Sequence, residues 1–430
     1  MSLITKDAFS KNVLILFVGT VIAQAIPIII SPVLTRLFTP EDFGLFALFF
    51  GISQIISVFV AGRYEMAIIL PEKDEDAVNI VALSLAITLL VSIICLVAVL
   101  LVRFFIPVQS GNPGIINYLL LMPITVLAIG VTTIFNFWLN RKEHYKSISG
   151  GKIARSVFSS FFSIGFGLTV LRAGGLIIAD TIGQIASGTF VFLKSLKYDK
   201  EKIAQISKQK MLIQAKRYKK FPKFNLLSGL LEKGSGQIPV ILLTSFFGPA
   251  ITGFFSLSQR LIAAPEILIS GSIGNVFRQQ ANIEYLQNGN CYDSFMKLFK
   301  LLLIIAVIPF ILLFFLAPFL FSFIFGPEWR VAGEYTQIMT VMFFLSFVVS
   351  PLSNMFIIAE KQKIDLFIQI ILFIFVSVSI IDGYNIFKHP KVAILLYSIT
   401  YCVKYCIELY LSFLFSKGKR NASKNLLKAE

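Results

Sequence analysis

The most constraining feature of the sequence is its first apolar stretch, which has no charged residue between Val13 and Thr35. About twenty apolar residues are enough to cross the ~30 Å hydrocarbon core of a bilayer as a single helix. The few polar residues of the stretch, Thr20, Gln24, Ser31 and Thr35, with Pro27 among them, recur at steps of three or four and fall on one side of that helix. Lipid disfavours such a stripe, and we expect it to face other helices or a water-filled cleft.

The turn that ends this stretch occurs twice in the chain. Residues 34–48 match residues 243–257 at seven of fifteen positions without a gap, and the matched residues include Pro40 and Gly44. Apolar residues match easily by chance, but a Pro and a Gly at one spacing do so less easily. We therefore infer two structural repeats, each opening with a helix, a Pro-Gly turn and a second helix.

Composition agrees with a membrane protein. The 430 residues are 56% hydrophobic, with 44 Phe and a mean hydropathy of +0.81, which is too apolar for a soluble core. We predict an all-α polytopic membrane protein with about 12 transmembrane helices, in two pseudo-symmetric six-helix lobes around a central cavity. The predicted spans are 12–35, 43–64, 77–102, 115–138, 153–171, 174–193, 225–247, 250–273, 298–323, 333–357, 365–382 and 391–413.

The predicted domains follow from these spans: a lobe at 1–193, a basic linker at 194–224, a second lobe at 225–416 and a basic tail at 417–430. Of the 39 Lys and Arg, 29 lie in segments on one side of the predicted map and six on the other. Cytoplasmic segments carry such an excess, so we expect both termini in the cytoplasm.

The net charge of +16 does not indicate nucleic-acid binding, because the basic residues are spread over loops without a reading module. Eleven of them lie in the linker, which we expect to be part helix and to bind anionic membrane lipids.

Chemistry-bearing motifs are scarce. His144 and His389 stand alone in opposite loops, and the four Cys lie in or beside apolar runs without metal-ligand spacing. The outer loops are too short for a catalytic domain. We expect a protein that is not an enzyme and that needs no metal and no cofactor.

The candidate site consists of charged and amide residues at membrane depth. Placing such side chains inside a bilayer costs free energy, so those that occur there usually serve a function. The offset of the repeat places Lys233 opposite Gln24, so each half turns a polar helix face toward the predicted cavity. For some of these charged residues a purely structural role is the alternative to ligand binding. Lys404 and Glu408 could form an ion pair, and Arg63 and Glu65 could reach the lipid headgroups. The substrate-binding candidates are Gln24, Arg63, Lys233, Gln259, Arg260 and Lys404, and the coupling or ion-pair candidates are Glu65, Glu232, Glu266 and Glu408.

Two segments resemble a known family. The run from Pro32 to Gly44, PVLTRLFTPEDFG, and the later Gly62-Arg63-Tyr64-Glu65 are similar to bacterial polysaccharide-biosynthesis flippases of the Wzx type, the O-antigen translocases. That family belongs to the multidrug/oligosaccharidyl-lipid/polysaccharide exporter superfamily. The distinctive similarity covers about the first eighty residues, and the twelve-span plan extends it over the chain.

The resemblance implies a flippase that works by alternating access in the bacterial inner membrane. Its implied cargo is an oligosaccharide repeat unit on undecaprenyl diphosphate, for O-antigen, capsule or exopolysaccharide, and its implied protein partners are the polysaccharide polymerase and chain-length machinery. The alternatives are a multidrug or cation antiporter of the same superfamily, a membrane-embedded polysaccharide polymerase or ligase, and a scaffold for glycan assembly. An antiporter would need acidic residues in the cleft, and a polymerase would need a large outer loop.

Overall fold

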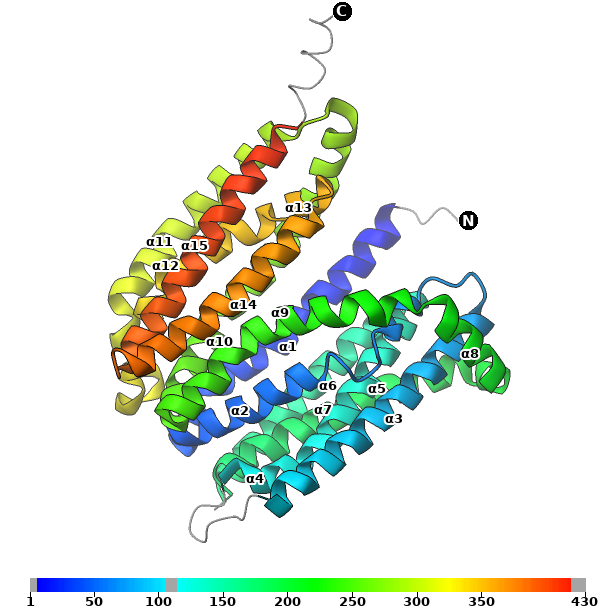
Figure 1. Ribbon diagram of the computed structural model, residues 1–430, viewed down its shortest axis with the longest axis horizontal. Helices are drawn as coiled ribbons and strands as arrows, with labels where there is room; N and C mark the ends of the chain where they lie inside the picture. The colour runs from blue at the N-terminus through cyan, green and yellow to red at the C-terminus, as the bar shows by residue number, and fades with distance from the viewer. Residues whose placement is uncertain (1–5, 106–113, 170, 419–430) are drawn as a thin grey trace, which may run out of the picture. The chain divides into compact units, whose positions relative to one another are not determined.

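The computed structural model describes the backbone of residues 6–105, 114–169 and 171–418, and the side chains of these ranges except for residues 6–13, 114, 203, 264–272 and 275. The described chain consists of helices and their connections, without a strand (Figure 1). The predicted all-α class is confirmed.

Twelve long helices correspond one to one with the twelve predicted spans. They are α1 (Lys6–Leu37), α2 (Pro40–Ile56), α3 (Asp74–Phe105), α5 (Met122–Arg141), α6 (Tyr145–Gly167), α7 (Ala173–Asp199), α9 (Lys220–Phe247), α10 (Pro249–Asn288), α11 (Tyr292–Phe325), α12 (Arg330–Leu352), α14 (Gln362–Asn385) and α15 (Pro390–Ser416). Short helices connect them: η1 (Tyr64–Ala67), α4 (Gly114–Tyr118), η2 (Leu119–Leu121), η3 (Lys200–Gln205), α8 (Lys208–Arg217), η4 (Pro327–Trp329) and α13 (Met355–Ile358). Among the described residues, eight helical segments are long and apolar enough to cross a membrane, as a multi-pass membrane protein requires.

Both copies of the repeated turn fold in the same way. Pro40 begins α2 directly after α1, and Pro249 begins α10 directly after α9, because proline needs no amide donor at the first helical position. Thr39 caps α2, with its side chain accepting from the amide of Asp42. Gly248 takes the corresponding place in the second copy with φ of 89°, a backbone angle that favours glycine. The two predicted helix-turn-helix openings are confirmed.

The second predicted span, 43–64, is longer than the helix that forms there. Helix α2 ends at Ile56, and the chain turns before η1. Gly62 and Arg63 both have positive φ, of 58° and 63°, which a right-handed helix cannot contain. Hydropathy alone carried the prediction past the end of the helix, since the residues after Ile56 remain apolar.

Helix α1 packs against α6 through polar contacts. Pro27 has no amide hydrogen, so the carbonyl of Ala23 lacks its usual donor within the helix, and Ser156 Oγ donates to that oxygen at 2.5 Å. One turn earlier, Lys152 Nζ donates to Thr20 Oγ1 at 3.0 Å. The first part of the predicted polar stripe thus meets α6 of its own half.

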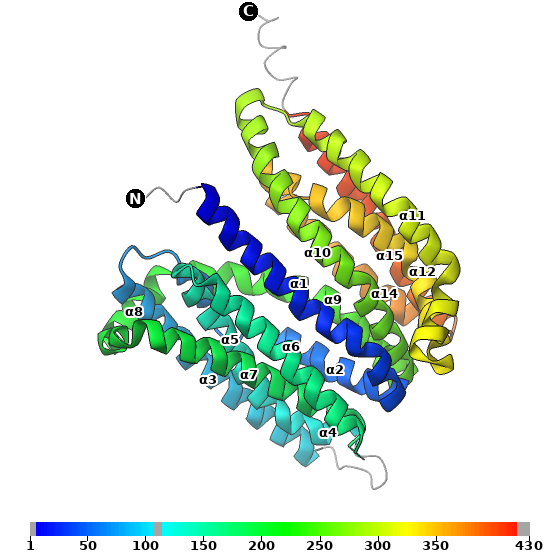
Figure 2. The ribbon, with the colours of Figure 1, turned by 180° about the vertical axis from the view of Figure 1, so that it is seen from behind.

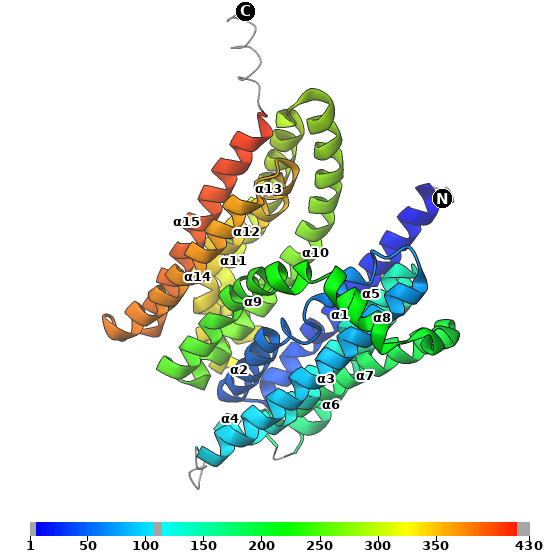
Figure 3. The ribbon, with the colours of Figure 1, turned by 45° about the vertical axis from the view of Figure 1, so that its right-hand side comes forward.

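The chain divides into two compact units, Met1–Thr244 and Ser245–Glu430. In the first, α3, α5, α7 and α6 lie side by side (Figures 1 and 2), and α7 contacts both α5 and α6. In the second, α11, α12, α15 and α14 lie side by side (Figure 3), and α12 is the central, most buried helix of the group. This division differs from the predicted lobes over α9. Most of α9 packs with the first unit, where Gly51 of α2 lies against Gln237 and Val240.

The basic linker folds onto the first unit. Ser207 N donates to Asn79 Oδ1 at 2.9 Å, and Asn79 Nδ2 donates to the carbonyl of Gln205 at 3.1 Å. From α8, Lys210 pairs with Glu75 and Gln214 Nε2 donates to Asp76 Oδ1 at 2.7 Å. The linker is part helix, as predicted, and it contacts the acidic start of α3. Its binding to anionic lipid stays a prediction.

Candidate functional site

The first group of candidates lies in the loop after α2. Arg63 packs its guanidinium against Gly229 of α9, so closely that a Cβ on that glycine would lie 1.6 Å from Arg63 Nη2. Tyr64 fixes the loop from the other side, since its hydroxyl donates to the carbonyl of Ala215 at 3.1 Å. Glu65 is buried, with 5% of its surface exposed. The loop is therefore anchored to α8 and α9 within the first unit.

Polar atoms in this loop are left without partners. Within the described part of the chain, Arg63 Nε and Glu65 Oε2 are buried and have no hydrogen-bond partner. An unpaired buried donor or acceptor costs about 1–3 kcal/mol. These two atoms lie within three residues of each other, so the loop places an unbonded donor and an unbonded acceptor close together in the sequence.

Lys233 lies near Arg63 along α9. It is the fourteenth of the 28 residues of α9, and it follows Gly229, the residue that Arg63 contacts, by one helical turn on the same face. The Lys233 side chain is exposed, as is that of the neighbouring Glu232. Among the described carboxylates, none forms an ion pair with Arg63 or Lys233. The structure thus brings two predicted cationic candidates to one face of one helix.

Gln24, the remaining candidate of the first unit, is half-buried on α1, one turn beyond Thr20.

Two charged residues of the first unit escaped the sequence analysis. Arg155 of α6 and Asp180 of α7 form an ion pair, with Nη2 and Oδ1 3.1 Å apart. Asp180 could have been noticed, because it is the single acid in the apolar run that follows Gly174. Arg155 could not, because its position near the start of a predicted span placed it among the loop charges.

In the second unit, the candidates lie along α15. Gln259 of α10 donates from Nε2 to the hydroxyl of Tyr397 at 2.8 Å. Tyr397, Tyr401 and Tyr405 follow one another at four-residue intervals, with ring centroids 5.0 Å and 6.0 Å apart. Ser346 Oγ of α12 bonds the hydroxyl of Tyr405 at 2.8 Å. These contacts form a polar row through an otherwise apolar helix group.

Lys404 and Glu408 form an ion pair, with Nζ and Oε2 2.8 Å apart, and the Lys404 ammonium also lies over the ring of Tyr405. The structural alternative for this pair is therefore the one that the geometry supports. Arg260 is exposed on α10, one residue beyond Gln259. The backbone of Glu266 belongs to α10, but its side chain lies outside the described residues.

The comparisons with known proteins agree with this architecture. The sequence profile of a family described as "Polysaccharide biosynthesis protein" matches residues 33–334. No curated protein matches the chain.

Among solved structures, the "Lipid II flippase MurJ, inward closed conformation" is similar, with a TM-score of 0.66, 16% identity, and coverage of 94% of this chain and 90% of that chain. An inward-facing multidrug resistance MATE family transporter of the MOP superfamily has a TM-score of 0.56 at 13% identity, covering 93% of both chains. A MOP superfamily transporter from Pyrococcus furiosus has a TM-score of 0.56 at 14% identity, covering 94% of both. At these identities the likeness shows the fold. Because the family profile covers well over half of the sequence, the chain belongs to the polysaccharide biosynthesis protein family, and it has the fold of the MurJ flippase and the MATE transporters.

Proposed function

We propose that this protein is a flippase that moves an oligosaccharide repeat unit, linked to undecaprenyl diphosphate, from the cytoplasmic to the outer leaflet of the bacterial inner membrane by alternating access. The family match supports a role in polysaccharide biosynthesis, and the fold supports transport of a membrane-bound molecule. The glycan can belong to an O-antigen, a capsule or an exopolysaccharide, and the polymerase and chain-length proteins would act on it next.

The observation that carries the proposal is that Arg63 contacts α9 at Gly229, one helical turn before the second cation, Lys233. Neither cation forms an ion pair with a described carboxylate, so the two can offer positive charge to the two phosphates of a diphosphate. Each such pair at 4 Å gains about 4 kcal/mol at an effective dielectric constant near 20. Arg63 adds a planar fork that can bind two phosphate oxygens at once.

Sugar hydroxyls need a polar environment of their own, because each one stripped of hydrogen bonds costs about 1–3 kcal/mol. Within the first unit, the half-buried amide of Gln24 on α1 can supply part of it. The prenyl chain can remain in lipid throughout the crossing.

A cation antiporter is less well supported. Such a transporter needs a carboxylate that is free to bind a cation. Asp180 is paired with Arg155 and Glu408 with Lys404, and the two candidate acids of the first unit that form no described ion pair, Glu65 and Glu232, are close in sequence to the cations Arg63 and Lys233. Among the described residues, Glu65 is the buried acid with an oxygen that has no hydrogen-bond partner, and the cation that interacts with it is Arg63, without a described ion pair. If Glu65 couples proton binding to export, Glu65→Gln should change the pH dependence of export.

The direct test replaces Arg63 and Lys233 by Ala, singly and together, in a strain whose own copy of the gene is deleted. We expect each variant to reach the membrane in normal amount and export to fall at least about tenfold, the loss typical of one charge-assisted hydrogen bond. Lipid-linked glycan should accumulate on the cytoplasmic side. Lys216→Ala, at an exposed position of α8, is the matched control and should export normally.

Normal export by a well-expressed double variant would end the assignment of Arg63 and Lys233. Export of a small cation, with no accumulation of lipid-linked glycan in the deletion strain, would instead favour the antiporter. Orientation is tested separately: reporter fusions after Lys210 and Lys419 should report cytoplasm, and one after Gly111 the opposite side, as the charge asymmetry predicts.

A further inference from the structure

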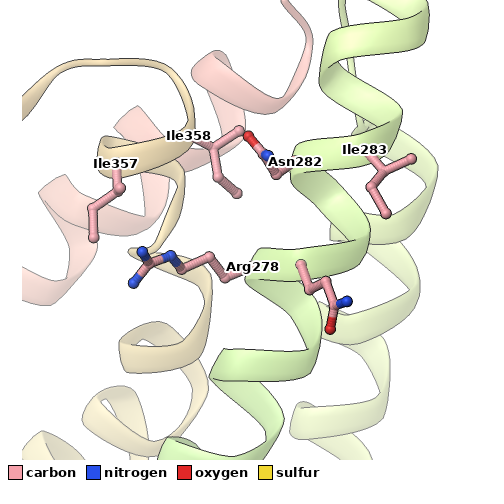
Figure 4. A pocket seen from close by; sticks show the side chains of 6 residues that line it. Arg278, Asn282, Ile283, Ile357 and Ile358 are labelled. Carbon is pink, nitrogen blue, oxygen red and sulfur yellow. The ribbon is translucent and has the colours of Figure 1, made fainter. Parts of the chain in front are cut away.

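A cavity of about 510 Å³ lies within the second unit, between the last turns of α10 and the short helix α13 (Figure 4). Its lining residues are Arg278, Gln279, Asn282, Ile283, Ile357 and Ile358. Arg278 and Asn282 point from α10 toward the segment that carries Ile357 and Ile358 (Figure 4). None of these residues belongs to the candidate site on α9 or to the tyrosine row on α15.

Beside this cavity, the chain at Pro351 and Asn354 approaches the backbone of α10 at Gly274 closely. The amide of Asn354, just before α13, donates to the carbonyls of Pro351 at 2.9 Å and Gly274 at 3.5 Å. A Cβ at Gly274 would lie 3.2 Å from that amide nitrogen, so glycine permits the contact. Beyond Gly274, α10 continues as one helix to Asn288, and the cavity lies between this last part of α10 and α13.

The cavity lies near the level of the lipid headgroups. Arg278 is 29 residues beyond Pro249, which is about 43 Å along α10 at 1.5 Å per residue. The hydrocarbon core is about 30 Å thick and the whole bilayer about 40–45 Å. A helix that starts at one face of the membrane therefore presents Arg278 close to the headgroups of the other.

The chemistry of the lining suits a phosphate. Arg278 is exposed, and no described carboxylate forms an ion pair with it. Asn282 follows it by one turn on the same face and adds two amide donors. A guanidinium with a neighbouring amide can bind two oxygens of a phosphate group.

The apolar surroundings indicate that this phosphate carries hydrocarbon. On the cavity side, Ile357 of α13 is 45% exposed, and on a different face of α10 from Arg278, Val276, Ile283 and Leu286 are 67%, 50% and 78% exposed. A helix with a cation on one face and large exposed aliphatic side chains on another is typical of a membrane interface. A site for free phosphate would have no need of them.

We propose that this cavity binds the headgroup of an anionic membrane phospholipid. Arg278 and Asn282 hold the phosphate, and Ile357 and Ile358 of the facing segment contact the first carbons of the acyl chains. The site is separate from the proposed cargo site, so its test does not depend on transport.

The test uses purified full-length protein, stripped of lipid in detergent and titrated with phosphatidylglycerol, with bound lipid counted by native mass spectrometry. We expect Arg278→Ala to weaken the tightest binding event about tenfold or more, since one charge-assisted contact is lost. Asn282→Leu should weaken it less. Arg103→Ala, at an exposed arginine at the end of α3, is the control and should bind like the wild type.

Parallel titrations identify the source of the phosphate. Phosphatidylcholine should bind more weakly than phosphatidylglycerol, and inorganic phosphate should fail to displace the lipid. Unchanged binding by both Arg278→Ala and Asn282→Leu would overturn the proposal. Equal affinity for phosphatidylcholine would refute the anionic preference, and displacement by inorganic phosphate at equal concentration would show a phosphate site instead.

Discussion

Lys404 and Glu408 lie one turn apart on α15, and their charged atoms are 2.8 Å from each other while the Glu408 side chain is only 4% exposed. Burial of a single carboxylate in such surroundings is costly, and the ammonium offsets that cost. The pair thus accounts for two charges in an apolar helix group without a ligand.

Removing Lys404 alone should destabilise the protein. Lys404→Ala leaves Glu408 buried and unpaired, and we expect a loss of about 3–5 kcal/mol, the range measured for broken buried pairs. Thermal unfolding in detergent measures it. The double variant Lys404→Ala with Glu408→Ala should recover much of the loss. Export that disappears in a stable Lys404→Ala protein would instead point to a ligand role.

Displacing Arg63 without removing its charge tests that residue independently. Gly229→Ala places a methyl group where the Arg63 guanidinium lies, and because the obstacle is the end of a flexible side chain, the fold should survive. We expect normal membrane levels with reduced export. The control, Gly236→Ala on the same helix, has no atom within 4 Å of the added Cβ and should export normally. Equal export by both variants would contradict a role for Arg63 at this position.

Arg260 can be tested by its geometry as well as its charge. It lies eleven residues beyond Pro249, about 16 Å along α10 and near the middle of a bilayer. If it binds the diphosphate, Arg260→Ala should insert and fold but stop export, and Arg260→Lys should restore export in part, since the charge survives without the fork. Arg103→Ala is the matched control. A loss of thermal stability with normal export would show a structural ion pair.

The contact between the linker and α3 should depend on Asn79 more than on the lysines. Asn79→Leu removes the buried amide that bonds both Gln205 and Ser207, leaving two backbone groups without partners at about 1–3 kcal/mol each. We expect faster limited proteolysis between residues 200 and 217. Lys210→Ala breaks an exposed pair and should change the cleavage rate little. Equal protection of all three proteins would show that the linker is held elsewhere.

The helices of this protein could be predicted from its sequence because hydropathy is a local property. Each of the twelve apolar runs became a helix, and the paired prolines at positions 40 and 249 begin helices in both repeats, since proline suits the first turn wherever it occurs. The ion pair of Lys404 and Glu408 was foreseeable for the same reason, because residues four apart on a helix are neighbours.

The tertiary structure decided which charges lie together. Arg63 meets Gly229 across 166 residues of sequence, and Arg155 meets Asp180 on another helix, contacts that no spacing rule contains. Positive φ at Gly62 and Arg63 ended α2 inside a run that hydropathy extends. Gly51 and Gly229 let α9 approach α2 and Arg63 closely, and Gly229 lies one turn before Lys233 on the same face of α9. Close packing selects such partners by shape, and the shape of a surface exists only once the helices have assembled.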